Sequence, residues 1–379
     1  MLFSLIHHGV FAFAAVVEED FYTYPLLNRN VVKEYAVAKV LEVNETLKNT
    51  QLGAYRRQLL TVRVLTGSQK GRIFVVPNYL SGRPDYDVVV KKGMKVILWL
   101  EYERGEKEPT NLYVSSYYRE GTLTFLLVLL VILTLVIGGI VGLKAILSLG
   151  FIIASIVFVL LPGVFFLRDW KIILLTLAIG VAGSALTYIL VAGFSKKALA
   201  SFLGSLGGML SAVLVGLLSV HMAHLTGLAR TEEKMLRFLE PDLNFQAILI
   251  SSFIIGTLGA VMDIAMSISS SVEEVKKANP AFGFADLLRS AFKVGRDVWG
   301  TMLNTLILAY VAEALPITLI YVDVRVSLLR SVNFEAIAVE LIRALLGGLG
   351  MVMTIPITAF FASYLFSKDS GRELKKMVM

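Results

Sequence analysis

The sequence predicts a polytopic α-helical membrane protein with about seven transmembrane helices and a small antiparallel β-barrel domain near the N-terminus. Three observations lead to this fold class. The 379 residues are 56% hydrophobic and 17% charged, with a mean hydropathy of +0.73, which is too apolar for a soluble domain. Apolar runs of about 20 residues recur, each long enough to cross a hydrocarbon core. Residues 30–118 differ, because short β-branched and aromatic runs alternate there with turn signals.

The charge and the missing motifs exclude several classes of protein. The net charge is +7, but the Lys and Arg residues flank apolar runs, which is typical of cytoplasmic loops rather than of a nucleic-acid-binding surface. Cysteine is absent, which excludes disulfides, a thiol nucleophile and a thiolate metal site. The motifs of zinc proteases, α/β-hydrolases and P-loop proteins are also absent. We therefore expect no nucleic-acid partner, no cofactor and no enzymatic activity.

Residues 1–29 form a signal-like or membrane-associated segment. A short apolar run ends in Ala12-Phe13-Ala14, which resembles a small-residue cleavage site, but the basic region that precedes the apolar core of a signal peptide is missing. A cleaved signal therefore competes with an uncleaved anchor or a segment on the membrane surface.

Residues 30–118 predict an extracytoplasmic domain of five strands. The strand-like runs are EYAVAKVLEV, RQLLTVRVL, GRIFVVPN, GMKVILWLEYERG and NLYVSSYYR. Five strands in so short a segment favour a small closed antiparallel barrel of OB- or SH3-like topology. The sequence offers no obvious exposed aromatic platform beyond Tyr117 and Tyr118. It therefore favours a structural or interaction module over a domain that binds sugar or nucleic acid.

The transmembrane domain is predicted for residues 119–367, followed by a basic cytoplasmic tail at 368–379. The expected spans are 122–143, 146–167, 172–194, 199–220, 245–270, 298–321 and 337–366. Alternate connections carry twelve Lys and Arg residues on one set and seven on the other. By the positive-inside rule the richer set faces the cytoplasm. The protein is therefore predicted to be a multi-pass protein of the cell membrane, with the β-domain outside and the C-terminus in the cytoplasm.

Two predicted spans carry a strongly polar residue where a bilayer-spanning helix normally has none. Asp263 lies in the fifth span and Asn304 in the sixth. Ionisable residues in such positions are costly and are usually functional. Antiparallel neighbouring helices would bring both residues to one depth, and Gly259 and Gly300 would let the helices approach closely. Helical spacing adds Met266, Ser267 and Ser270 to the stripe of Asp263, and Asp297, Thr301 and Thr305 to the cluster of Asn304.

This pattern has a functional and a structural interpretation. Carboxylate, amide and hydroxyl oxygens suit a hard cation or a proton, and Glu313 in the outer half of the sixth span either extends this pathway or simply reaches toward water. The thioethers of Met262, Met266 and Met302 offer an alternative for a soft ion. In the structural interpretation Asp263 and Asn304 hydrogen-bond each other and fix the helix pair.

His221 and His224 form a second candidate site. They lie three residues apart at the predicted outer end of the fourth span, with Glu232 and Glu233 nearby. Two imidazoles on one helix face suit zinc binding or pH sensing. No third ligand has a convincing spacing, so ordinary interfacial histidines are the competing interpretation.

Other patterns predict packing. Glu340 and Arg343 have the spacing of an intrahelical ion pair. Residues 281–296 are basic and amphipathic, which predicts a helix on the cytoplasmic membrane surface. Pro356 predicts a kink or a break in the last span. The glycines of the fourth span, Gly204, Gly207, Gly208 and Gly216, predict a close-packing face.

Several of these stretches resemble the YibE/F-like family of prokaryotic integral membrane proteins. They are HLTGL at 224–228, GTLGAVMDIAMSISSSVEEVKKANP at 256–280, GRDVWGTMLNTLILAY at 295–310 and RALLGGLGMVMTIPITA at 343–359. The resemblance extends to the barrel that ends in YYRE and covers nearly the whole chain. It implies an integral membrane protein with an outer β-domain, and it implies no substrate or reaction.

The sequence thus predicts a secondary transporter or permease for a small ion or solute, with proton coupling as one option. The alternative is a non-transporting scaffold or complex subunit that docks partners through its β-domain. The expected partners are the lipid bilayer and the transported ion or solute, with a second copy of the chain or another membrane protein as further options.

Overall fold

The computed structural model describes residues 31–50, 53–83, 87–103, 105–167 and 169–368. The chain divides into two compact units, one covering Phe11–Leu133 and one containing Thr134–Met379, and each unit is described by itself. The predicted N-terminal segment 1–29, and all but the first residue of the predicted tail 368–379, lie outside the described residues.

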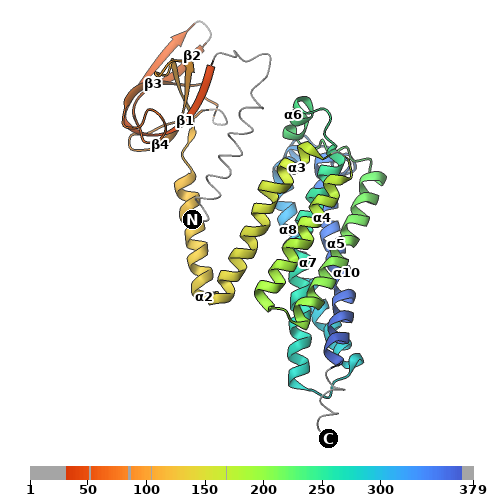
Figure 1. The fold of residues 1–379 in the computed structure, drawn as a ribbon. Coiled ribbons are helices and arrows are strands. Elements are labelled where there is room, and N and C mark those ends of the chain that lie inside the picture. Colours follow the sequence, from red (N-terminus) through yellow and green to blue (C-terminus); the bar gives the residue numbers. More distant parts are fainter. Residues whose placement is uncertain (1–30, 51–52, 84–86, 104, 168, 369–379) are drawn as a thin grey trace. The chain divides into compact units, whose positions relative to one another are not determined.

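Five antiparallel strands form the β-domain, as the sequence predicts (Figure 1). In the sheet they follow the order β3-β2-β1-β4-β5, with the long first strand at the centre. The strands are β1 (Val31–Thr50), β2 (Gly53–Val64), β3 (Ile73–Leu80), β4 (Lys95–Glu103) and β5 (Asn111–Tyr117).

The sheet curls around one apolar core but does not close. Alternate residues such as Ala38, Leu60 and Leu98 are completely buried on its inner face. Register shifts interrupt the pairing of β1 with β2 and of β4 with β5, and such bulges increase the local twist and bend of a sheet. The prediction of a closed barrel was wrong, because β3 and β5 end the hydrogen-bonded order instead of pairing with each other. The domain is a curled half-barrel.

A half-buried carboxylate ties the loop after β2 to the sheet. Glu34 on β1 accepts hydrogen bonds from the Ser68 backbone amide at 2.6 Å, from the Ser68 hydroxyl and from the Tyr102 hydroxyl at 2.8 Å. Burial alone would raise the pKa of Glu34, but the bonds from Ser68 and Tyr102 stabilise the charged form and hold this pKa below its usual value.

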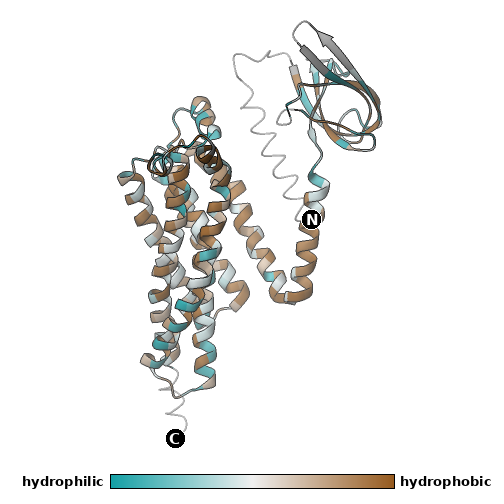
Figure 2. Ribbon diagram, turned by 180° about the vertical axis from the view of Figure 1, so that it is seen from behind, coloured by the Kyte–Doolittle hydropathy of each residue, from teal (hydrophilic) through white to brown (hydrophobic). Residues whose placement is uncertain are grey.

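Six helices in the described residues are long and apolar enough to cross a membrane, and Figure 2 shows apolar colouring along most of α2. The first candidate runs from Glu120 to Phe166 and combines α2 with the short η1 and α3. The unit also contains α6 (Thr231–Leu239) and α9 (Leu328–Val332). The bounds of the others are α2 (Glu120–Ser155), η1 (Ile156–Leu160), α3 (Leu161–Phe166), α4 (Lys171–Ala192), α5 (Lys196–Met222), α7 (Phe245–Ala278), α8 (Phe284–Asp323) and α10 (Glu335–Ser367).

The helix from Glu120 to Phe166 covers the first two predicted spans. It is interrupted once, but not at the residue where the sequence predicted the boundary between these spans. A straight helix of its 47 residues would measure about 70 Å, more than twice the thickness of a hydrocarbon core. The helix breaks at Gly139, whose φ of 52° and ψ of −130° lie outside the region that other residues adopt. The sequence placed the break near Lys144, but that residue lies inside the second leg of α2.

Helix α7 lies at the centre of the bundle and packs against α4, α5, α8 and α10. The predicted glycine face of α5 meets α10. A Cβ atom on Gly204 would overlap the Thr358 hydroxyl, and one on Gly208 would overlap the Thr354 hydroxyl. Gly216 does not share this close contact, since its nearest neighbours lie at 3.7 Å or beyond.

The basic amphipathic segment 281–296 is not a separate surface helix. It forms the start of α8, which runs without interruption from Phe284 to Asp323. Leu287 and Ala291 are completely buried, so tertiary packing extends the helix into this segment. Pro356 likewise does not break the last span, because α10 continues through it.

Candidate functional site

A line of small and polar residues runs along one side of α7. Its members are spaced by three or four residues and therefore share one helix face. Asp263 and Gly259 are exposed, and nothing lies within 4 Å of the Cβ that Gly259 lacks. Within the described residues the Asp263 carboxylate has no hydrogen bond or ion pair. We call this line the α7 stripe: Ser252, Gly256, Gly259, Asp263, Ser267 and Ser270.

Helix α8 runs antiparallel to α7 beside this stripe. The Tyr310 hydroxyl donates to the Gly256 carbonyl oxygen at 3.4 Å, and a Cβ on Gly295 would lie 3.2 Å from Ile268. Asp263 lies between these two contacts along α7, and Asn304 lies between them along α8.

The polar cluster predicted on α8 lies on a different face of that helix from Tyr310. Asp297, Thr301, Asn304 and Thr305 are exposed, and helical spacing puts Asn304 about 120° from Tyr310 around the axis. The Thr301 hydroxyl donates to the carbonyl oxygen of its own helix at Val298. Asn304 and Asp263 form no hydrogen bond with each other among the described atoms.

The expected close approach at Gly259 and Gly300 was wrong. Nothing lies within 4 Å of a Cβ on either glycine. The close glycine contacts of α8 lie elsewhere: with α7 at Gly256 and Gly295, and with α10, where Leu306 faces Gly347 and Leu303 lies 2.9 Å from a Cβ on Gly348. Between its contacts with α7 at Gly256 and Gly295, α8 leaves the middle of the α7 stripe open at Gly259 and Asp263.

An ion-pair cluster lies near the α6 end of the bundle. Glu340 on α10 is 5% exposed and accepts hydrogen bonds from Arg230 at 2.8 Å and from Arg343 at 2.7 Å. Arg230 also donates to Glu313 on α8 at 2.6 Å. The hydrogen bond to Glu313 raises the pKa of Arg230, burial opposes this effect, and Glu340 adds to it. The predicted Glu340–Arg343 pair is therefore present, as part of a larger cluster.

This cluster connects to the α7 stripe. Arg343 donates to the Ser252 hydroxyl at 3.2 Å, and its guanidinium lies 5.9 Å from the centre of the Tyr310 ring. Sequence reasoning identified Glu313 but missed Arg230, Ser252 and Tyr310. The spacing of Ser252 from Asp263, eleven residues or about three turns, was the available signal.

Charged residues also lie at the other end of the stripe. Glu273 on α7 pairs with Lys197 on α5 at 2.9 Å and with Lys277 at 3.2 Å, and Lys277 pairs with Glu274 at 2.9 Å. Asp263 is about ten residues from Glu273 and about eleven from Ser252, so it lies near the middle of the line between the two charged clusters.

The remaining predicted ligands are more dispersed. His221 and His224 are exposed at the end of α5, and the described part of the chain has no group of three or more His, Cys, Asp or Glu residues that could hold a metal. The zinc interpretation stays a prediction without a third ligand. Met266 is half-buried and lies near the Ser201 hydroxyl, while Met262 is buried and accepts a hydrogen bond from Tyr188 at its carbonyl oxygen.

Comparison with protein families matches both parts of the chain. A family described as YibE/F-like protein matches residues 126–368, and a domain described as YibE/F family N-terminal domain matches residues 31–117. The chain belongs to the YibE/F-like family. The resemblance found in the sequence is thereby confirmed. Searches of curated proteins and of solved structures find no match.

One YibE/F-like motif has a clear structural role. In the HLTGL stretch, the Thr226 amide donates to the Glu335 carboxylate at 2.6 Å and the Gly227 amide at 3.1 Å. Glu335 is the first residue of α10, so this contact fixes the loop after α5 to the start of α10. The motif therefore shapes the end of the bundle at which the ion-pair cluster lies.

The N-terminal domain of this YibE/F-like protein carries an aromatic surface that the sequence reasoning missed. Tyr35, Trp99 and Tyr113 lie opposite one another on β1, β4 and β5, with ring centres 6.3 Å and 6.0 Å apart. Lys33 lies 4.5 Å above the Trp99 ring. The expectation of no platform beyond Tyr117 and Tyr118 was wrong, because the pairing of distant strands brings these rings together.

Proposed function

We propose that this YibE/F-like protein is a secondary transporter or permease that moves a small ion or solute along the α7 stripe. In this proposal the Asp263 carboxylate binds the cargo or carries a coupled proton. The observation that carries the proposal is the exposure of Asp263 in the middle of a candidate membrane span, with no hydrogen-bond or ion-pair partner among the described residues.

The energetics of a carboxylate in a membrane support this role. A charged group in the hydrocarbon region costs several kcal/mol unless it is paired, protonated or hydrated. The structural alternative would offset that cost with a hydrogen bond from Asn304, and no such bond links the two described side chains. An open carboxylate can instead exchange water, a proton or a cation, as a transport site must.

The rest of the stripe supports a continuous path. Ser252, beside Arg343, lies on one side of Asp263, and Ser267 and Ser270 lie on the other. Hydroxyl and carboxylate oxygens suit hard cations and protons. We propose that Thr301, Asn304 and Thr305 contribute to this path when α8 rotates or shifts relative to α7, since they now lie on the adjacent exposed face.

Flux measurements in proteoliposomes test this function. The full chain is reconstituted and assayed with a panel of monovalent and divalent cations, with and without a pH gradient. We expect Asp263→Asn to abolish flux of the active ion. Asp242→Asn is the matched control, because Asp242 is an exposed carboxylate outside the candidate spans. Unchanged flux in a folded Asp263→Asn protein would refute the assigned site, and absence of flux across the whole panel would argue against transport of these ions.

The aromatic surface favours a second candidate function, in which the β-domain docks a partner. Tyr and Trp are enriched at binding hot spots, and here the exposed rings of Tyr35 and Tyr113 flank the half-buried ring of Trp99. If the β-domain docks a partner, Trp99→Ala should weaken assembly of the full-length protein with a membrane partner. Flux through the variant should stay at the wild-type level. The exposed Tyr79 on β3 offers a control, since Tyr79→Ala removes an aromatic ring outside this surface. Equal assembly of wild type and Trp99→Ala would eliminate this candidate.

A further inference from the structure

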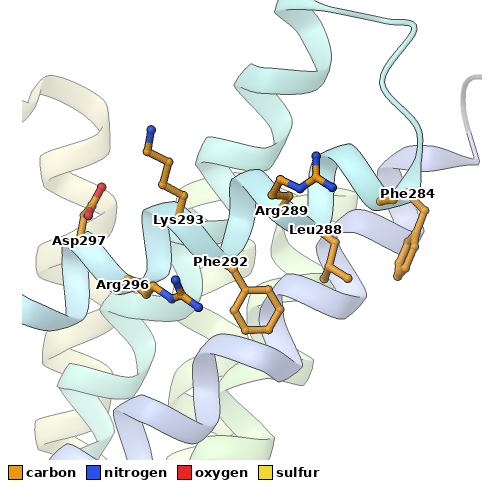
Figure 3. A pocket seen from close by; sticks show the side chains of 8 residues that line it. Phe284, Leu288, Arg289, Phe292, Lys293, Arg296 and Asp297 are labelled. Atoms are coloured by element: carbon orange, nitrogen blue, oxygen red, sulfur yellow. The ribbon is translucent and has the colours of Figure 1, made fainter.

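An open hollow of about 740 Å³ lies along the first turns of α8 (Figure 3). Its lining combines two kinds of side chain on adjacent stripes of one helix. Figure 3 shows Phe284, Leu288 and Phe292 on the side of α8 that faces α10, with Arg289 and Arg296 next to them. Neither the transport proposal nor the α7 stripe involves this part of α8.

The basic stripe consists of Arg289, Lys293 and Arg296. Their spacing of four and three residues puts them on one helix face over about 10 Å of axis. All three are exposed, and none has an ion pair or hydrogen bond from its charged group within the described ranges. The lining also contains the carboxylate of Asp297, which in Figure 3 projects on the same side of the helix as Lys293, while Arg296 points elsewhere; one carboxylate thus faces three cations. The hollow therefore keeps an excess of positive charge.

The apolar stripe is anchored in the bundle. Phe284, Leu288 and Phe292 are half-buried, and the Phe284 ring packs edge-on against Phe360 of α10 at 5.8 Å. These side chains form a fixed apolar wall directly beside the cations. Farther along, α8 continues into the apolar part that is long enough to cross a membrane.

We propose that this hollow binds an anionic phospholipid, with the phosphate on Arg289, Lys293 and Arg296 and the start of an acyl chain against Phe284, Leu288 and Phe292. The charge complementarity identifies the headgroup, because basic clusters at the end of a membrane helix attract anionic lipids. The adjoining apolar wall favours a lipid over a free phosphate, because only a lipid has an apolar chain that can contact Phe284, Leu288 and Phe292. The inference rests on the membrane assignment and not on the transport proposal.

Native mass spectrometry of the full chain in a neutral detergent tests the site. Phosphatidylglycerol and phosphatidylcholine serve as the anionic and zwitterionic probes. Each cation near an anionic lipid contributes roughly fivefold in affinity, so Arg289→Gln/Lys293→Gln/Arg296→Gln should weaken phosphatidylglycerol binding about a hundredfold. Binding of phosphatidylcholine should not change. The single exposed change Lys293→Glu should weaken phosphatidylglycerol binding in the same direction and serves if the triple variant does not fold.

A matched control removes three exposed cations elsewhere. Lys171→Gln/Lys234→Gln/Arg330→Gln loses the same charge at exposed positions outside the hollow and should keep wild-type binding. Three results would overturn the proposal. One is unchanged phosphatidylglycerol binding in the folded hollow variants, and another is equal weakening in the control. The third is full displacement of the lipid by inorganic phosphate at comparable concentration, which would assign the hollow to phosphate alone.

Discussion

Removal of the Glu340 charge should destabilise the helical bundle more than removal of any other carboxylate of the ion-pair cluster. Glu340 is 5% exposed and bonds two guanidinium groups, whereas Glu313 is 47% exposed and bonds one. The substitution Glu340→Gln keeps the shape of the side chain but removes its charge, and it leaves one acceptor oxygen for the two guanidinium groups of Arg230 and Arg343.

The expected loss of stability follows from these contacts. Removing one partner of a buried ion pair typically costs about 3–5 kcal/mol. Arg230 keeps its bond to Glu313 in the variant, so we expect the lower end, about 3 kcal/mol. For the unit that contains Thr134–Met379, that corresponds to a fall in Tm of roughly 6 °C. The control Glu313→Gln breaks the exposed ion pair of Glu313 with Arg230, which should lower the free energy of unfolding by at most about 1 kcal/mol.

Thermal unfolding of the purified full chain in detergent, followed by circular dichroism, measures both variants. A double variant with Arg230→Gln then tests whether the effects of Glu340 and Arg230 are coupled. Equal shifts for Glu340→Gln and Glu313→Gln would refute the reasoning, because burial would then not determine the cost. A shift below about 1 °C for Glu340→Gln would do the same.

Two further predictions concern packing and pH. Gly204→Ala should destabilise the bundle by about 1–3 kcal/mol in thermal unfolding, because the added Cβ overlaps Thr358. The matched change Gly216→Ala should be neutral or stabilising by up to about 1 kcal/mol, since its Cβ has room. Equal destabilisation by both changes would contradict the α5–α10 contact. The lowered pKa of Glu34 contributes stability that is present above its unfolded value of about 4.3 and is lost as the pH falls through the lower folded value. Acid unfolding of the β-domain, followed by Trp99 fluorescence with Trp170 and Trp299 replaced by Phe, should therefore depend less on pH in Glu34→Gln, and an unchanged profile would exclude this contribution.

Local patterns in the sequence were enough to predict the strands and most of the helices. Alternation around Leu60 and Leu98 reflects a sheet with one buried face, and long apolar runs reflect helices that need no polar partner. The end of such a run is harder to predict. A single charge at Lys144 suggested a boundary, while the break depends on the backbone of Gly139.

The candidate site was predictable only in part, because lateral packing decides which residues meet. The stripe of Asp263 follows from periodicity within one helix. The cluster around Glu340 does not, since Arg230 is 110 residues away in the chain and belongs to a loop region between α5 and α7. The glycine contacts of α8 with α10 also depend on which helices become neighbours, and this overturned the close approach expected at Gly259.

The break at Gly139 has a consequence for the sidedness of the whole protein. Both legs that it separates, residues 120–138 and 140–166, have roughly the 20 residues that a crossing requires. Each crossing exchanges the side on which the chain emerges, so the parity of crossings decides whether the residues before α2 and those after α10 share a compartment. Two legs in place of one change this parity from even to odd. If both legs cross the membrane, the backbone conformation of Gly139 is what adds this seventh crossing to the six candidate helices.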